Sequence, residues 1–284
     1  MPPRITPTVR QQRLGAELRK LRESAGVSTQ EAGALLGVNR TRVPNIESGR
    51  FGISPERVRT LACNYECPDS DLVEALADMA SERATGWWEA YRGRLPAPFL
   101  DVAELEYHAR RMTAFVMVHI PGLLQTGDHA RAVFEKTLVA LPAKEVELRA
   151  AHRIQRQDVL LERTDPAPYT AIIHEAALRM QFGGSKVARA QLDHILTVSE
   201  LAHITVRVIP FGAEGFAGPG QPIFYADGPV PQLDTVQLDS FHGSVFLDSE
   251  MQLRNYRRLI DRMAATSLSA EDSRTLIHTI AQQH

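Results

Sequence analysis

Cysteine is scarce in this chain, since Cys63 and Cys67 are the only two among 284 residues. Two thiols separated by three residues provide neither the four ligands of a structural zinc site nor a disulfide framework, so we expect reduced cysteines. No apolar run approaches the roughly 18 residues that span a bilayer, and the opening segment MPPRITPTVR lacks the apolar core of a signal peptide. We therefore expect a cytoplasmic protein with no membrane partner.

Signatures of common enzyme classes are also missing. His174 and Glu175 are not followed by the second histidine of a zinc-protease helix. The glycine-rich segment 211–222 has neither a Gly-Lys-Ser/Thr ending nor the spacing of a dinucleotide fingerprint, and no G-x-S-x-G elbow surrounds Ser185 or Ser244. We expect no enzyme activity, no metal and no cofactor, and we interpret segment 211–222 as a surface loop.

Charge is distributed unevenly, although the whole chain carries a formal net charge of only -2 at pH 7. Residues 1–65 contain 11 Lys and Arg against 5 Asp and Glu, whereas the remaining residues contain 21 against 29. This asymmetry is expected when one domain meets phosphate and the other does not. A length of 284 residues with 44% hydrophobic content suits two domains with cores of their own.

Segment 27–49 predicts two short helices joined by a tight turn. Ser28 followed by Glu31 is the pattern of a capping box, so a helix starts at Ser28. Gly33 leaves room for a second helix to cross closely, and Gly37 supplies a left-handed turn. The buried stripe of this first helix is expected to consist of Ala32, Leu35 and Leu36.

The second helix of the pair has the composition of a DNA-reading element. Asn39 is suited to cap it, and Val43 and Ile46 face inward. Its outward side carries donors and acceptors that suit base edges and phosphates, namely Arg40, Thr41, Arg42 and Asn45.

This segment resembles the phage-repressor (Cro-like, XRE) helix-turn-helix family through Gly33, Gly37 and the closing I-E-S-G of residues 46–49. The resemblance implies that Arg22 of the preceding helix pairs with Glu47. The DNA contacts that it implies are Ser28, Thr29, Arg42 and Arg50 on phosphate, and Arg40, Thr41 and Asn45 on bases.

Two positions depart from the family pattern. Thr29 stands where a glutamine is common, and Pro44 lies inside the second helix, where proline removes a hydrogen bond and costs roughly 3 kcal/mol. We expect that helix to be short or kinked.

Residues 1–84 are expected to fold as an all-α, five-helix repressor-type head, preceded by a loose proline-rich arm over residues 1–8. The first helix ends near Gly26, the fourth follows a Ser54 cap, and the fifth runs from Asp69 to about residue 84. Residues 85–104 form an aromatic connector that we expect to be docked against a neighbouring surface.

Residues 105–284 are expected to form an α/β domain with a mixed sheet flanked by helices. Strands are predicted at 114–120, 169–174, 204–210, 222–226, 235–238 and 244–247. Helices are predicted at 144–163, 186–202, 250–266 and from residue 269 onward. The pattern leaves the strand order open, because hairpin-length loops alternate with helical crossovers.

The order of several motifs resembles actinobacterial regulators of the WhiJ-like type, often described as antitoxin-like. These motifs are GWW at 86–88, PGLLQT at 121–126, HEAALR at 174–179 and ITVRVIPF at 204–211. The resemblance implies transcription regulation, often beside a small partner protein, with no settled chemistry for the large C-terminal domain.

Two surfaces of the second half are candidates for receiving a signal. We expect the first to combine the aromatic connector with the PGLLQT turn; its residues are Trp87, Trp88, Tyr91, Pro121, Gly122 and Gln125. The second is the basic face of helix 144–163, for which a solvated face is the default interpretation. The functional alternative is that it receives an acidic partner protein or pairs with acidic residues of its own domain.

The sequence therefore predicts a DNA-binding transcriptional regulator that binds an inverted-repeat operator as a homodimer. A small-molecule effector or a small acidic partner protein would modulate operator affinity through the C-terminal domain. The alternative is an antitoxin-like interaction protein that sequesters a small protein partner and binds DNA to control its own gene.

Overall fold

The computed structural model describes residues 7–82, 86–215, 218, 220–240 and 243–284. Most of the proline-rich arm, the predicted end of the fifth helix near residue 84 and part of segment 211–222 lie outside the described residues. The chain divides into two compact units, Met1–Arg92 with Phe99–Leu105 and Gly93–Pro98 with Glu106–His284. None of the helices in the described ranges combines the length and apolar character that crossing a membrane requires.

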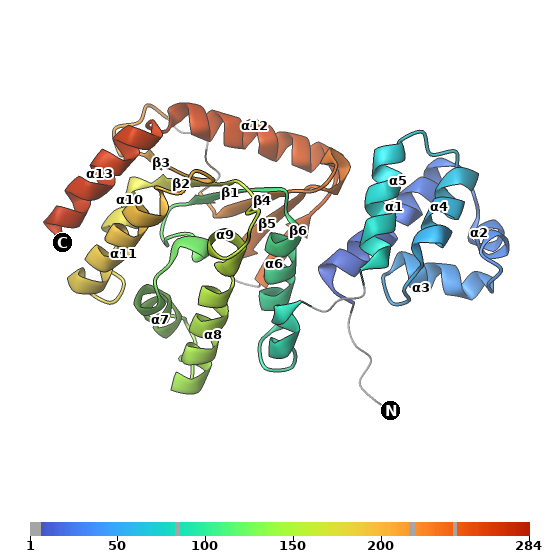
Figure 1. Ribbon diagram of the computed structural model, residues 1–284, viewed down its shortest axis with the longest axis horizontal. Coiled ribbons are helices and arrows are strands. Elements are labelled where there is room, and N and C mark those ends of the chain that lie inside the picture. Colours follow the sequence, from blue (N-terminus) through green and yellow to red (C-terminus); the bar gives the residue numbers. More distant parts are fainter. Residues whose placement is uncertain (1–6, 83–85, 216–217, 219, 241–242) are drawn as a thin grey trace. The chain divides into compact units, whose positions relative to one another are not determined.

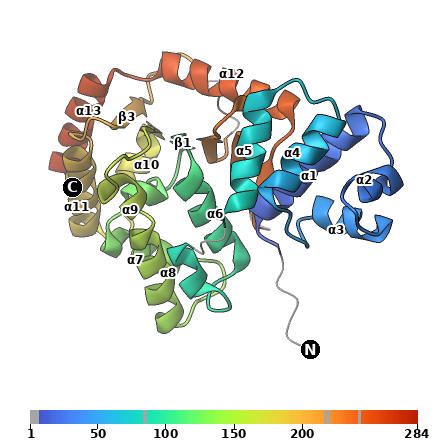
Figure 2. The same ribbon diagram turned by 45° about the vertical axis from the view of Figure 1, so that its right-hand side comes forward.

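Unit 1 is helical, as the sequence predicts. Its elements are α1 (Val9–Ser24), α2 (Thr29–Leu35), the 3₁₀ turn η1 (Arg40–Arg42), α3 (Val43–Glu47), α4 (Pro55–Asn64), α5 (Ser70–Ser81) and the 3₁₀ turn η2 (Trp87–Tyr91). The α-helices α1, α2, α4 and α5 begin after side-chain caps from Thr8, Ser28, Ser54 and Asp69. Helices α4 and α5 pack on each other and on α1, while α2, η1 and α3 lie together (Figure 2).

Pro44 shortens the predicted recognition helix without breaking it. The segment after Asn39 forms η1 first, and α3 starts at Val43, so Pro44 lies in the first turn of α3. A proline is tolerated there because a first-turn N–H has no partner within the helix.

The expectation for Leu35 was wrong, because its side chain is 39% exposed while Ala32 and Leu36 are buried. Helix α2 is only seven residues long and ends at Leu35, so a third buried position on the same stripe is not available.

Unit 2 contains a six-stranded mixed sheet in the order β3-β2-β1-β4-β5-β6 (Figure 1). The strands are β1 (Arg111–Val116), β2 (Tyr169–His174), β3 (Ile204–Ile209), β4 (Ile223–Asp227), β5 (Thr235–Ser240) and β6 (Gly243–Leu247). Strands β1, β2 and β3 are parallel, and β4, β5 and β6 continue antiparallel from β1. Only β1 is displaced appreciably from its predicted range.

Helices cover both faces of this sheet. They are α6 (Ala97–His108), which the unit boundary divides, α7 (Gly127–Glu135), α8 (Ala143–Gln155), α9 (Asp158–Leu161), α10 (Glu175–Arg179), α11 (Ser185–Val198), α12 (Glu250–Thr266) and α13 (Ala270–Gln283), with 3₁₀ turns η3 (Gly122–Leu124) and η4 (Pro231–Leu233). Helix α12 lies along one face, and α7, α8 and α11 lie on the opposite side (Figure 1).

The core beneath α12 is apolar. Phe115, Ile172 and Tyr225 of the sheet pack with Leu253 and Met263 of α12, all at most 2% exposed. The register explains this shared face, because Phe115 is paired with both Ile172 and Ile223, and alternate residues of a strand point to the same side.

The predicted helix 144–163 is two helices. The chain turns between α8 and α9, where the Gln157 amide N–H bonds to the Ile154 carbonyl oxygen at 2.9 Å. The side chain of Gln157 is buried and donates to the Gln125 carbonyl oxygen at 2.6 Å, which ties this turn to η3. Helices α6, α7 and α10 were not predicted.

Candidate nucleic-acid interface

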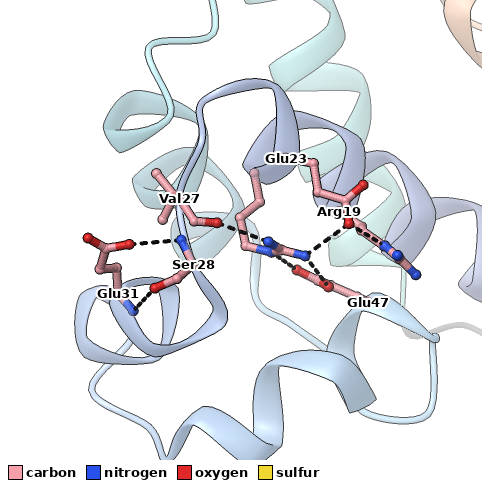
Figure 3. A network of polar contacts seen from close by, with 7 residues as sticks. Arg19, Glu23, Val27, Ser28, Glu31 and Glu47 are labelled. Atoms are coloured by element: carbon pink, nitrogen blue, oxygen red, sulfur yellow. Dashed lines mark hydrogen bonds and ion pairs between the residues drawn. The ribbon is translucent and has the colours of Figure 1, made fainter.

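The helix-turn-helix segment begins with a complete capping box. The Ser28 hydroxyl accepts a hydrogen bond from the Glu31 amide at 3.2 Å, and the Ser28 amide donates to Glu31 Oε2 at 2.8 Å (Figure 3). Hydrogen bonding to the Ser28 side chain, and then to the Ser28 amide, holds the pKa of the Glu31 carboxyl below its usual range. Gly37 has φ +64 and ends this helix, as a left-handed turn requires.

Two glycines allow the helices of the head to pack closely. A Cβ on Gly33 would lie 2.9 Å from the Val38 carbonyl oxygen, so a larger residue would push the turn away. Gly15 of α1 has the same function against α3, since its Cβ would lie 2.5 Å from the Glu47 carbonyl oxygen. The sequence analysis did not single out Gly15, although a glycine inside a helix signals such a contact.

An ion pair fixes α1 against the end of α3. Arg22 Nε lies 2.5 Å from Glu47 Oε1, and Arg22 Nη2 lies 3.1 Å from Glu47 Oε2. The two side chains are only 10% and 9% exposed. Arg22 Nη1 also donates to the Val27 carbonyl oxygen at 2.9 Å, just before the Ser28 cap (Figure 3). The structure thus brings together the pair that the sequence resemblance implied, and the bond to Glu47 raises the pKa of Arg22.

The predicted base-reading and phosphate-contacting side chains lie on the outside of this segment. Ser28, Asn39, Arg40, Thr41, Arg42 and Arg50 are exposed, and Thr29 and Asn45 are partly buried. Asn39 Oδ1 accepts hydrogen bonds from the Thr41 amide at 3.0 Å and from the Thr41 hydroxyl at 2.9 Å. Asn45 Nδ2 donates to the Thr41 carbonyl oxygen at 3.0 Å, and the Oδ1 atom of Asn45 takes no part in that bond. Hydrogen bonds therefore link Asn39 and Asn45 to Thr41 of η1.

The arginines of the head fall into two groups. The first group forms ion pairs with glutamates and consists of Arg10, Arg13, Arg19, Arg22, Arg59 and Arg92. Arg40, Arg42, Arg50 and Arg57 are exposed and have no carboxylate of the described residues within ion-pair distance. All four of these lie between η1 and the first turn of α4, in residues 40–57, which we call the recognition segment. The positive charge that the described part of the head leaves without an ion-pair partner is concentrated there.

Phe51 is a residue that the sequence analysis missed. Its side chain is 44% exposed, and the Arg42 guanidinium carbon lies 5.3 Å from the centre of its ring. A cation–π contact of this kind restricts a long side chain that would otherwise be mobile. A phenylalanine directly after Arg50 was the available signal.

The six residues predicted to receive a signal lie in different units. In unit 1, Trp87 contacts the rings of Trp88 and Tyr91 edge-on at 6.0 and 5.9 Å, and Trp88 is buried. In unit 2, Pro121 and Gln125 are buried and Gly122 is partly buried. Their combination into one surface stays a prediction.

The basic face of α8 is compensated within its own unit. Arg149 pairs with Glu145 at 2.5 Å, and Arg156 Nε donates to Glu106 Oε2 at 2.7 Å. For Arg149 and Arg156, the structure therefore supports the interpretation in which this face pairs with acidic residues of its own domain. Arg153, between them on α8, instead donates to the neutral side chain of Gln125.

Comparison with known protein families matches both parts of the chain. Residues 13–76 match a helix-turn-helix domain, and residues 99–279 match a domain of unknown function designated DUF5753. A search of curated proteins found no match, and no solved structure matched. The helix-turn-helix match supports a DNA-binding regulator. The second match covers more than half of the chain, and the protein therefore belongs to the DUF5753 family.

Proposed function

We propose that the protein is a sequence-specific transcriptional regulator, and not an enzyme, that binds an inverted-repeat operator as a homodimer. The observation that carries the proposal is the concentration of exposed, uncompensated arginines on the recognition segment of a helix-turn-helix domain. Base edges are read from such a helix, and phosphates are held by arginines that keep their charge available.

The dimer is proposed from the size of the reading element. Segment 40–47 presents only Arg40, Thr41 and Asn45 as base-reading candidates, and this number suits a few base pairs. Two copies related by a two-fold axis would read two half-sites about one helical turn apart. The C-terminal unit would then receive the signal that changes operator affinity.

The test begins with selection of bound sequences from random double-stranded DNA, using the full chain. We expect one enriched inverted repeat, and binding that weakens steeply with salt because phosphate contacts release counterions. Arg50→Ala should weaken all sequences similarly and reduce the salt slope by about one unit.

Arg59→Ala is the matched control. It removes the same charge from an exposed arginine of the same unit, but Arg59 is paired with Glu74 at 2.6 Å. If Arg59→Ala and Arg50→Ala reduce DNA affinity equally, or if selection enriches no sequence, the proposal is wrong. Recovery of a stoichiometric small protein from cells, without an enriched DNA site, would favour the antitoxin-like alternative.

A further inference from the structure

The face of the sheet opposite α12 carries a polar cluster built around Arg153. The guanidinium of Arg153 lies 4.3 Å from the centre of the Phe134 ring, and its Nη1 donates to Gln125 Oε1 at 2.9 Å. Its Nε is buried and has no hydrogen-bond partner among the described residues. Arg149 and Arg156, the arginines on either side, each have a glutamate. Arg153 has no described carboxylate within ion-pair distance. Burial lowers the pKa of Arg153 to about 9, and the carboxylates of Asp239 and Glu106 oppose this shift.

Gln125 itself is held rigidly. It is 1% exposed, and its Nε2 donates to the Ile120 carbonyl oxygen at 2.6 Å. Its Oε1 is thereby oriented as an acceptor for Arg153, so this bond fixes the position of the cation without neutralising it.

Histidines 119 and 129 extend the cluster. The ring of Phe182 lies 4.9 Å from the His119 ring and 5.6 Å from the His129 ring. His129 is 2% exposed, and neither of its ring nitrogens has a partner among the described residues. Burial lowers the pKa of His129 to about 4, with His119 and Arg153 acting in the same direction. His129 is therefore neutral near pH 7 and offers one N–H donor and one acceptor.

Gly122 lies next to the cation. A Cβ at this position would lie 3.8 Å from Arg153 Nε and 3.5 Å from Arg156 Nη2. The PGLLQT turn thus places a residue without a side chain beside the unpartnered nitrogen.

We propose that the C-terminal unit binds a small organic monoanion whose carboxylate accepts hydrogen bonds from Arg153, with the rings of Phe134, Phe182, His119 and His129 around its apolar part. The Nε–H of Arg153 and the imidazole of His129 are buried without partners among the described residues, which is costly, and a bound carboxylate would accept the hydrogen bond that Arg153 Nε can donate. That this ligand changes operator affinity rests on the function proposed above.

The charge count selects a monoanion over a phosphate. Of Arg149, Arg153 and Arg156, the first and the last form ion pairs, and the charge of Arg153 is balanced only by Asp239 and Glu106 from beyond ion-pair distance. A dianion would leave one negative charge uncompensated in a partly desolvated site. The neighbouring rings favour an organic acid that places apolar or aromatic surface against them.

The first experiment uses the full chain without DNA and the probes benzoate, benzamide and inorganic phosphate. We expect saturable binding of benzoate in calorimetry and a shift of the Arg153 Nε–H signal in NMR spectra. The neutral benzamide and the dianionic phosphate should bind at least tenfold more weakly. Absence of benzoate binding at millimolar concentration, or an unchanged Arg153 signal on saturation, overturns the site.

Two variants and one control locate the binding. Arg153→Met should weaken benzoate about tenfold or more, because a charge-assisted hydrogen bond is lost. Gly122→Ala adds a methyl group at ordinary contact distance, so it should fold normally and weaken benzoate several-fold. Arg131→Met removes an exposed arginine that is paired with Glu147 and Asp128, and it should leave benzoate affinity unchanged. Equal effects of Arg131→Met and Arg153→Met would contradict the assignment.

The effector role is tested separately by measuring operator affinity with and without saturating benzoate. A change that Arg153→Met abolishes supports the role, and reciprocity requires the operator to change benzoate affinity by the same factor. Benzoate binding with unchanged operator affinity would overturn the effector role and leave the site intact. Failure to select any operator would overturn the proposed function while the binding measurement without DNA still stands.

Discussion

Arginines without an ion-pair partner have opposite surroundings in the two units. In unit 1 the arginines without carboxylates are exposed and lie along one recognition segment. In unit 2 the side chain of Arg153 is mostly enclosed, stacked on Phe134 and fixed by Gln125. Exposed guanidinium groups lose little hydration when they approach a polyanion, whereas an enclosed one gains most from a single ligand that reaches it.

This difference predicts different responses to salt. DNA binding by several exposed arginines should depend steeply on ionic strength because counterions are released. Binding of one carboxylate to one enclosed guanidinium should depend on salt weakly, because solvent ions screen an enclosed pair less. The number of arginines does not distinguish a DNA-binding surface from a carboxylate-binding site, so the surroundings of each guanidinium must be compared.

The largest expected effect comes from breaking the Arg22–Glu47 ion pair. This pair is enclosed, whereas the arginines without an ion-pair partner in the same head are exposed. Arg22→Met should destabilise unit 1 by about 3–5 kcal/mol, because Glu47 remains buried without its partner. Calorimetry on the full chain should show the head melting earlier and the melting of unit 2 unchanged. Arg59→Met is the control, since the exposed Arg59–Glu74 pair is expected to contribute less than about 1 kcal/mol. Equal melting of the parent and Arg22→Met would show that the pair does not stabilise the head.

The second expected effect is an opposite pH response of the two units. Burial lowers the pKa of His129 to about 4 and of His152 to about 3, below the usual 6.5. Between pH 6.5 and 4 the unfolded chain therefore binds more protons than the folded one, and unit 2 loses stability as the pH falls. The loss should approach about 3 kcal/mol for one such histidine.

Unit 1 should show the reverse trend over part of this range. Burial raises the pKa of Glu104 to about 7, although a hydrogen bond from Thr8 opposes the shift. The folded state then holds more protons between pH 4.5 and 7, so this group makes the unit less stable as the pH rises. Calorimetric scans across this range should separate the two trends. Glu104→Gln should flatten the trend of unit 1, and His129→Leu should flatten that of unit 2.

Local rules predicted the head well because its signals are local. The Ser28–Glu31 capping box, the Gly37 turn and the caps at Ser54 and Asp69 each act within four residues of chain. Gly15 was missed because it packs against Glu47, which is distant along the chain. Phe51 was missed because its contact is with another surface side chain, that of Arg42.

The second unit was predicted less completely, for physical reasons that can be identified. Helix α6 begins after Pro96 and carries Pro98 in its first turn, so its start resembles a connector. Helix α10 has only five residues, too few for a helical period to be recognised. Arg149 pairs with Glu145 four residues earlier in α8, whereas the Glu106 partner of Arg156 and the Gln125 partner of Arg153 depend on tertiary packing. Strand order likewise depends on crossovers that periodicity does not encode.

A smaller effect is expected from Arg40, which distinguishes reading of bases from general attraction to DNA. Arg40→Ala should weaken binding to the selected operator by about 1–3 kcal/mol and relax the preference at one base position. Competition between single-base operator variants measures this relaxation. A uniform loss across all variants would assign Arg40 to phosphate instead and leave Thr41 and Asn45 as the base-reading candidates.

The smallest expected effect tests whether the exposed arginines are partly ordered before DNA arrives. The Arg42 guanidinium lies 5.3 Å from the centre of the Phe51 ring, and Phe51 is 44% exposed. Phe51→Leu keeps an apolar side chain of moderate size, so the stability of the head should change little. It removes the cation–π contact, which contributes about 0.5–1 kcal/mol at exposed sites. Because Arg42 must then be immobilised when it binds phosphate, affinity for operator and for random DNA should fall together, by about two- to fivefold.

In the Arg42→Ala background the same substitution should have no further effect. An equal loss in both backgrounds would mean that Phe51 contacts DNA itself, and that Arg42 does not depend on its ring.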